Sequence, residues 1–134
     1  MEAPQKSVEK TLARFFAGRG DVAAAYRFVD AHQIHRRGPS YVDIGVLLHP
    51  LVDHIRYEEI RLEIAEVLHV ELCTAEVRVL ILNDASANLC FDLVRQGEVV
   101  YTGSAEIQRD FEGRVQAEFL RSIDMPGRHL PDSF

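Results

Sequence analysis

The chain has 134 residues, 47% of them hydrophobic, which suits one compact domain with its own core and leaves too little chain for a second. Its formal net charge of −6 argues against general nucleic-acid binding, because neutralising phosphates requires a basic surface. The amino terminus lacks a signal peptide and no apolar run approaches the roughly 20 residues that span a membrane, which predicts a cytoplasmic protein without a membrane partner.

The first half of the chain predicts a helix, two strands and a second helix. Helical spacing of apolar residues predicts helices over about 4–17 and 57–68, and apolar runs predict strands over 22–28 and 41–48. Pro50 ends the second strand, since proline cannot donate to a strand ladder. The apolar faces of the two helices are predicted to be Val8, Leu12, Phe15 and Phe16, and Ile60, Ile64, Val67 and Leu68.

The second half predicts a strand over 75–82, a short helix over about 87–95, a small strand over 99–101 and a last helix that ends near Ile123. Ser86 and Ser104 are the predicted N-caps of the two helices. Their predicted core residues are Leu89, Phe91, Leu93 and Val94 in the first, and Ile107, Phe111, Val115, Phe119 and Leu120 in the second.

This order of elements predicts a small α/β (α+β) domain in which helices flank a mixed sheet. The domain is expected to cover residues 1–123, followed by a flexible tail over 124–134. Cys73 and Cys90 lie among apolar residues and are predicted to be small core residues with free thiols, in keeping with a reducing cytoplasm.

The histidines and Ser40 do not form a recognisable site. His32 and His35 have a three-residue spacing, but no nearby cysteine or carboxylate completes a set of metal ligands. His49 and His54 flank a turn and are predicted to be structural or exposed. Ser40 has no base and orienting group around it, so nucleophilic catalysis has no support.

The strand, polar loop and strand over 22–48, with Asp43 near the start of the second strand, resemble the minimal nucleotidyltransferases of the DNA polymerase β superfamily. Later segments at 79–85, 93–97 and 99–101 follow in the same order and strengthen the resemblance, which covers about 8–123. The resemblance implies an antitoxin-type nucleotidyltransferase-like domain.

The residues that carry catalysis in that family are mostly replaced here. The family closes its first strand with Gly-Ser, and this chain has Val29 and Asp30 at those positions. Of the family's three metal-binding aspartates, the resemblance implies that the first position holds Tyr41, the second holds Asp43 and the third holds Arg78. A single carboxylate binds Mg²⁺ poorly, because this ion requires several oxygen ligands. Arg78 is instead expected to form an ion pair with Asp43.

The phosphate side of the expected site is altered as well. Glycine lets a backbone approach a phosphate closely, whereas Val29 adds a β-branched side chain there. Asp30 would cap the following amides itself and repel a triphosphate. The remaining candidate for anion binding is the basic loop with His32, His35, Arg36 and Arg37, which fits a residual phosphate, an RNA, an acidic partner or a solvated loop.

We therefore predict a catalytically inactive nucleotidyltransferase-like protein that acts as a protein-binding module without a cofactor. Its resemblance implies a HEPN-type ribonuclease toxin as partner, with the last helix, the tail after Pro126 and the basic loop as candidate surfaces. Homo-oligomerisation is the other partner hypothesis. One alternative is a repurposed transferase using Mg²⁺ and ATP, in which Glu76 or Asp84 joins Asp43 as a metal ligand. Another is a structural oligomer subunit without any ligand.

Overall fold

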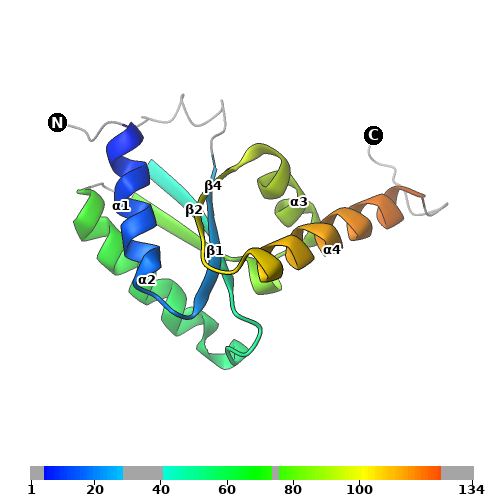
Figure 1. The fold of residues 1–134 in the computed structure, drawn as a ribbon, viewed down its shortest axis with the longest axis horizontal. Helices are drawn as coiled ribbons and strands as arrows, with labels where there is room; N and C mark the ends of the chain where they lie inside the picture. The colour runs from blue at the N-terminus through cyan, green and yellow to red at the C-terminus, as the bar shows by residue number, and fades with distance from the viewer. Residues whose placement is uncertain (1–4, 29–40, 74–75, 125–134) are drawn as a thin grey trace.

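The computed structural model describes residues 5–28, 41–73 and 76–124 (Figure 1). Its helices are α1 (Gln5–Ala17), α2 (Tyr57–Leu72), α3 (Ala87–Gln96) and α4 (Ala105–Asp124), with 3₁₀ turns η3 (His54–Arg56) and η4 (Leu82–Asp84). Its strands are β1 (Val22–Arg27), β2 (Tyr41–Leu48), β3 (Glu76–Ile81) and β4 (Glu98–Thr102). Every element predicted from the sequence is present, although α2 continues one turn beyond its predicted end at Leu68. None of the helices in these ranges is long and apolar enough to cross a membrane.

The four strands form a mixed sheet, as the sequence predicted, and their order in the sheet is β3-β2-β1-β4. β1 pairs antiparallel with both β2 and β4, whereas β2 and β3 pair in parallel. β2 is therefore a central strand, which explains its nearly continuous apolar sequence. β3 and β4 form the two edges of the sheet.

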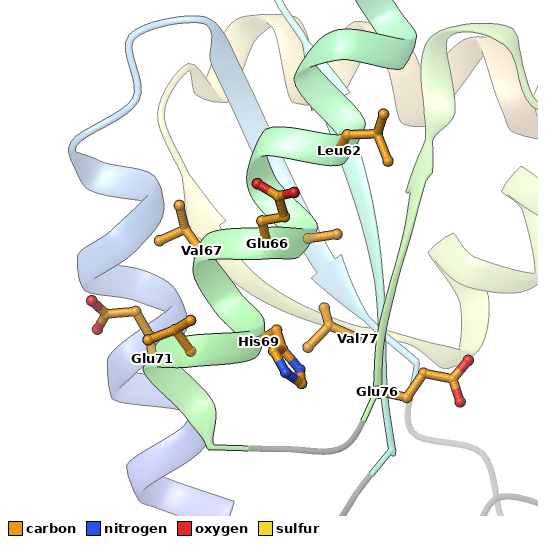
Figure 2. A pocket seen from close by; sticks show the side chains of 9 residues that line it. Leu62, Glu66, Val67, His69, Glu71, Glu76 and Val77 are labelled. Carbon is orange, nitrogen blue, oxygen red and sulfur yellow. The ribbon is translucent and has the colours of Figure 1, made fainter.

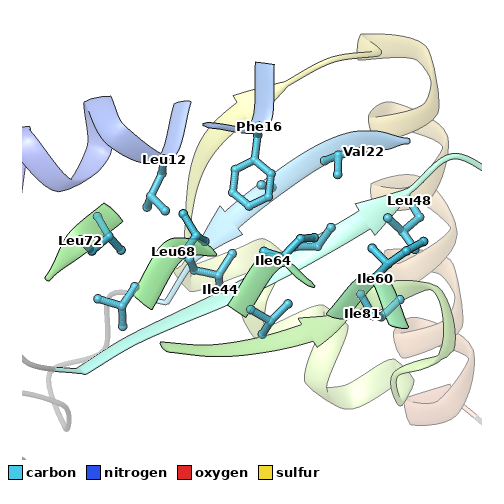
Figure 3. Packing of buried hydrophobic residues seen from close by; sticks show 14 of the residues in the cluster. Leu12, Phe16, Val22, Ile44, Leu48, Ile60, Ile64, Leu68, Leu72 and Ile81 are labelled. Atoms are coloured by element: carbon cyan, nitrogen blue, oxygen red, sulfur yellow. The ribbon is translucent and has the colours of Figure 1, made fainter. Parts of the chain in front are cut away.

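Helices cover both faces of the sheet, with α1 and α2 on one face and α3 and α4 on the other (Figure 1). The core under α1 and α2 is the larger one (Figure 3). Its members come from alternate positions of the strands and from i, i+4 positions of the helices. They include Leu12, Phe16, Val22, Ile44, Val46, Leu48, Ile60, Ile64, Leu68, Leu72 and Ile81.

The second core lies between the sheet and the helices α3 and α4. It contains Tyr26, Leu47, Leu82, Cys90, Leu93, Phe111 and Val115. Gly45 allows α3 to approach β2 closely, because a Cβ at this position would lie 2.4 Å from Leu93 Cδ2. Cys90 is buried in this core, as predicted.

Several predicted core residues are exposed, and Cys73 is the clearest correction. Cys73 ends α2 in the left-handed conformation, with φ of 51°, and its thiol is exposed and contacts only the carbonyl of Val70 among the hydrogen-bond acceptors described. A residue that terminates a helix leaves the helix face that packs on the sheet, which explains its exposure. Val67, Leu89 and Leu120 are also exposed, by 42%, 37% and 56%, because they lie beside the buried stripes of their helices.

Both predicted serine caps are present. The Oγ of Ser86 accepts a hydrogen bond from the Leu89 amide, and the Oγ of Ser104 accepts one from the Ile107 amide, each at 3.2 Å. Each serine thereby satisfies one of the free amides in the first turn of its helix.

We expect Ser104→Ala to lower the free energy of unfolding by about 1 kcal/mol, because it removes the cap of α4. Urea denaturation followed by circular dichroism measures the change. Ser122→Ala, an exposed substitution late in the same helix, is the matched control and should change stability by less than about 0.5 kcal/mol. Equal losses in the two variants would contradict the capping role.

Candidate functional site

The structure pairs Asp43 with Arg78, as the sequence analysis expected. The parallel register of β2 and β3 places these two residues directly opposite each other. Residues opposite each other in a sheet project from the same face, so their side chains meet. Arg78 donates from Nε to Asp43 Oδ1 at 2.8 Å and from a terminal nitrogen to Asp43 Oδ2 at 3.1 Å. This two-point pairing is the strongest geometry available to a guanidinium and a carboxylate.

The pair lies on the face of the sheet that α3 and α4 cover. Asp43 shares its strand face with Gly45 and Leu47, which contact the second core. The backbone carbonyl of Asp43 accepts a hydrogen bond from the Phe28 amide at 3.1 Å, so the site adjoins the end of β1. The Asp43 side chain is 13% exposed and that of Arg78 is 48% exposed. The carboxylate is thus mostly buried, whereas about half of the Arg78 side chain is open to solvent.

The described residues do not fit the Mg²⁺ that the family resemblance implies. Both oxygens of Asp43 already accept hydrogen bonds from Arg78, a fixed cation. Mg²⁺ would have to displace the guanidinium and would meet its positive charge within the same site. Among the described residues, no three His, Cys, Asp or Glu side chains lie together as candidate metal ligands.

The two carboxylates considered as replacement ligands lie in different places. Glu76 begins β3 opposite Tyr41, two residues before Arg78 and so on the same face of the strand, and this exposed residue also borders a groove beside α2. Asp84 lies in η4, after the end of β3. Because a strand advances about 3.3 Å per residue, Asp84 is far from Asp43 at the other end of the parallel pair. Only Glu76 remains near the site.

The other residues singled out from the sequence do not join this pair in the described structure. His49 donates its amide to the Asp21 carbonyl, and exposed His54 lies in η3 with Nδ1 3.6 Å from Asp53 Oδ1. These placements agree with structural or exposed histidines. Val29, Asp30, His32, His35, Arg36, Arg37 and Ser40 lie outside the described residues.

Sequence reasoning missed a buried polar network on the same face of the sheet. The hydroxyl of Tyr26, which is 1% exposed, donates to Glu112 Oε2 at 2.6 Å. Gln108 donates to the same carboxylate at 3.1 Å and accepts from Thr102 Oγ1 at 2.7 Å. Burial and the hydrogen bond that Tyr26 donates to the Glu112 carboxylate raise the pKa of Tyr26 far above its ordinary value. The available signal was Glu112 beside Phe111 on the apolar face of the last helix, with Gln108 one turn before it.

The chain was compared with known sequences and with solved structures. The sequence matches no family model and no curated protein sequence. Among solved structures, the chain is similar to one chain of a complex from Shewanella oneidensis, in which a tri-AMPylated HEPN toxin is bound to an MNT antitoxin. The TM-score is 0.66, at 22% identity over 90% of each chain. It is also similar to the toxin–antitoxin MntA–HepT, with a TM-score of 0.64 at 23% identity over 89% of this chain and 90% of that one.

A third similar structure is a toxin–antitoxin with AMP-PNP, with a TM-score of 0.64 at 21% identity over 86% of this chain and 89% of that one. The chain therefore shares the α+β fold found in these toxin–antitoxin structures, with helices on both faces of a four-stranded mixed sheet.

Proposed function

We propose that this protein is a catalytically inactive nucleotidyltransferase-like module that binds a protein, as the antitoxin partner of a HEPN-type ribonuclease toxin in the cytoplasm. The observation that carries the proposal is the two-point ion pair between Arg78 and Asp43. In this proposal, the guanidinium of Arg78 stands in for the divalent metal that the transfer reaction needs.

The nature of the similar structures supports the choice of partner. They are toxin–antitoxin complexes, and in one of them the HEPN toxin is tri-AMPylated. A protein with the same fold but with Arg78 on its remaining aspartate has the scaffold for such a complex without the metal ligands for AMPylation. In this proposal, contact with the toxin replaces its chemical modification.

The end of α4 supports a role in protein contact. The carboxyl-terminal half of α4 extends beyond the sheet (Figure 1). Leu120 and Ile123 on this half are 56% and 57% exposed, so they are available to a partner. The last helix was one of the surfaces that the sequence analysis nominated.

We expect no stabilisation of the purified protein by Mg²⁺ and ATP, because the phosphate and metal positions carry the wrong charges. A nucleotide that bound at 100 times its dissociation constant would add about 2.7 kcal/mol, which thermal denaturation detects readily. The antitoxin whose complex with AMP-PNP is known serves as the positive control.

Asp43→Ala should leave neutralisation of a co-expressed cognate HEPN toxin unchanged, and mass spectrometry should find no AMP on that toxin. Thermal denaturation of the variant checks that the fold survives loss of the ion pair. Saturable Mg²⁺–ATP stabilisation that Asp43→Ala abolishes, together with AMP on the toxin, would establish the repurposed transferase instead. Failure of the purified chain to bind any HEPN toxin while it assembles with itself would establish the structural oligomer subunit.

A further inference from the structure

Helix α2 carries a second apolar stripe that its own domain does not cover. Its first stripe, at i, i+4 spacing, is buried against the sheet and consists of Ile60, Ile64, Leu68 and Leu72. The second, at i, i+3, i+4, i+7 and i+8, combines the apolar residues Leu62, Ala65 and Val70 with the polar residues Glu66 and His69. Leu62 and Val70 are 49% and 70% exposed. This spacing is the pattern by which one helix packs along another.

The second stripe faces an open groove along the edge of the sheet. Figure 2 shows Leu62 and His69 of α2 on one side and Val77 and Glu76 of β3 on the other. β3 is an edge strand, so no described strand closes the groove on that side. We call these nine residues the α2–β3 groove: Leu62, Ala65, Glu66, Val67, His69, Val70, Glu71, Glu76 and Val77.

The groove has an unbalanced negative charge. Glutamates elsewhere on α2 are paired, Glu58 with Arg61, Glu59 with Arg56 and Glu63 with Arg19. Glu66, Glu71 and Glu76 form no ion pair with another described residue. The groove therefore combines an apolar stripe with three carboxylates at its rim, to which no described residue supplies a counter-charge.

We propose that the α2–β3 groove binds a basic amphipathic helix of the protein partner. Apolar side chains of such a helix would cover Leu62, Val70 and Val77, and its lysines or arginines would pair with the three carboxylates. The inference rests on the proposed function in taking the occupant to be a protein, and it assigns that partner a surface and a chemistry.

The same charges disfavour a second copy of this chain as the occupant. Two grooves brought face to face would oppose Glu66, Glu71 and Glu76 with their own copies, and like charges repel. A charged residue on an edge strand protects the sheet from aggregation, and this explains Glu76 without any partner. It does not explain why Leu62 and Val70 are exposed on α2.

The test is an NMR titration of the ¹⁵N-labelled full chain with a leucine–lysine amphipathic helix of about four turns. A leucine–glutamate peptide of the same pattern is the charge control. The leucine–lysine peptide should shift the amides of α2 and β3, and the leucine–glutamate peptide should not bind. Glu66→Gln/Glu71→Gln/Glu76→Gln should weaken binding about fivefold to tenfold, the sum of three exposed ion pairs. The double variant Leu62→Ser/Val70→Ser should weaken peptide binding at least as much. The substituted positions in both variants are exposed, so the fold should persist.

The matched control is Glu106→Gln/Asp110→Asn/Glu118→Gln, which removes three exposed negative charges from α4 on the other side of the sheet. It should leave the affinity within about twofold, apart from long-range screening effects. Equal weakening in both triple variants, or shifts confined to α4, would overturn the inference. Shifts of the groove amides that grow with protein concentration alone would show self-association and would also overturn it. Binding of Mg²⁺–ATP in the separate denaturation assay would refute the proposed inactivity and leave this result unchanged.

Discussion

Leu93→Ala should lower the free energy of unfolding by about 2–5 kcal/mol, among the largest losses expected for a single substitution in this chain. Leu93 is fully buried between α3 and the sheet, so truncation leaves a cavity there. Urea denaturation at neutral pH measures the effect. Leu89→Ala on the same helix is the control, because Leu89 is 37% exposed and its loss should cost far less.

A double-mutant cycle with Gly45 tests whether this contact sets the distance between α3 and β2. A Cβ at residue 45 would lie 2.4 Å from Leu93 Cδ2 and 3.1 Å from Leu82 Cδ2. Gly45→Ala alone should therefore cost about 1–3 kcal/mol through overpacking. In the Leu93→Ala background it should cost less, because the methyl group that it meets is gone. Strictly additive losses would show that another contact holds the helix.

Tyr26→Phe should lower stability by about 1.5–3 kcal/mol at neutral pH, since it removes a hydrogen bond to a carboxylate in a half-buried site. The substitution preserves the ring and its contact with Phe111, so the loss reports on the hydroxyl. Tyr57→Phe is the control, because the Tyr57 hydroxyl forms no hydrogen bond with another residue in the described ranges. Thermal and urea denaturation of both variants should separate them clearly.

Tyr26 should also make the protein sensitive to alkali. Burial and the neighbouring Glu112 raise its pKa in the folded state above the ordinary 10.0 of an unfolded tyrosine. Its contribution to stability is therefore complete below pH 10 and is lost as the pH rises above that value, because the unfolded chain releases the proton first. Stability measured between pH 7 and 11 should fall more steeply for the native chain than for Tyr26→Phe. Parallel curves would contradict this assignment.

Local patterns in the sequence were enough to predict the elements and their order. Apolar spacing, the serine caps and the break at Pro50 depend on residues within a few positions of each other, so they can be read along the chain. The resemblance to nucleotidyltransferases then led to the expected pair of Asp43 and Arg78, which lie 35 residues apart. Periodicity alone would not have joined them, because it does not specify which strands are neighbours.

The positions of other residues depended on how the elements pack. Cys73 is exposed and Leu93 is buried, although both belong to apolar segments, because only one lies on a helix face that meets the sheet. Tyr26 and Glu112 meet across 86 residues, and this contact requires α4 to lie over β1.

The sequence alone thus predicted the helices, the strands and a mixed sheet, since these follow from short-range spacing and residue identity, whereas the role of Asp43 came from the family resemblance. The burial of Tyr26 against Glu112 and the exposed second stripe of α2 were decided only by the packing of the layers. The physical reason is the same in each case: burial and side-chain pairing depend on distances between segments that are remote in sequence.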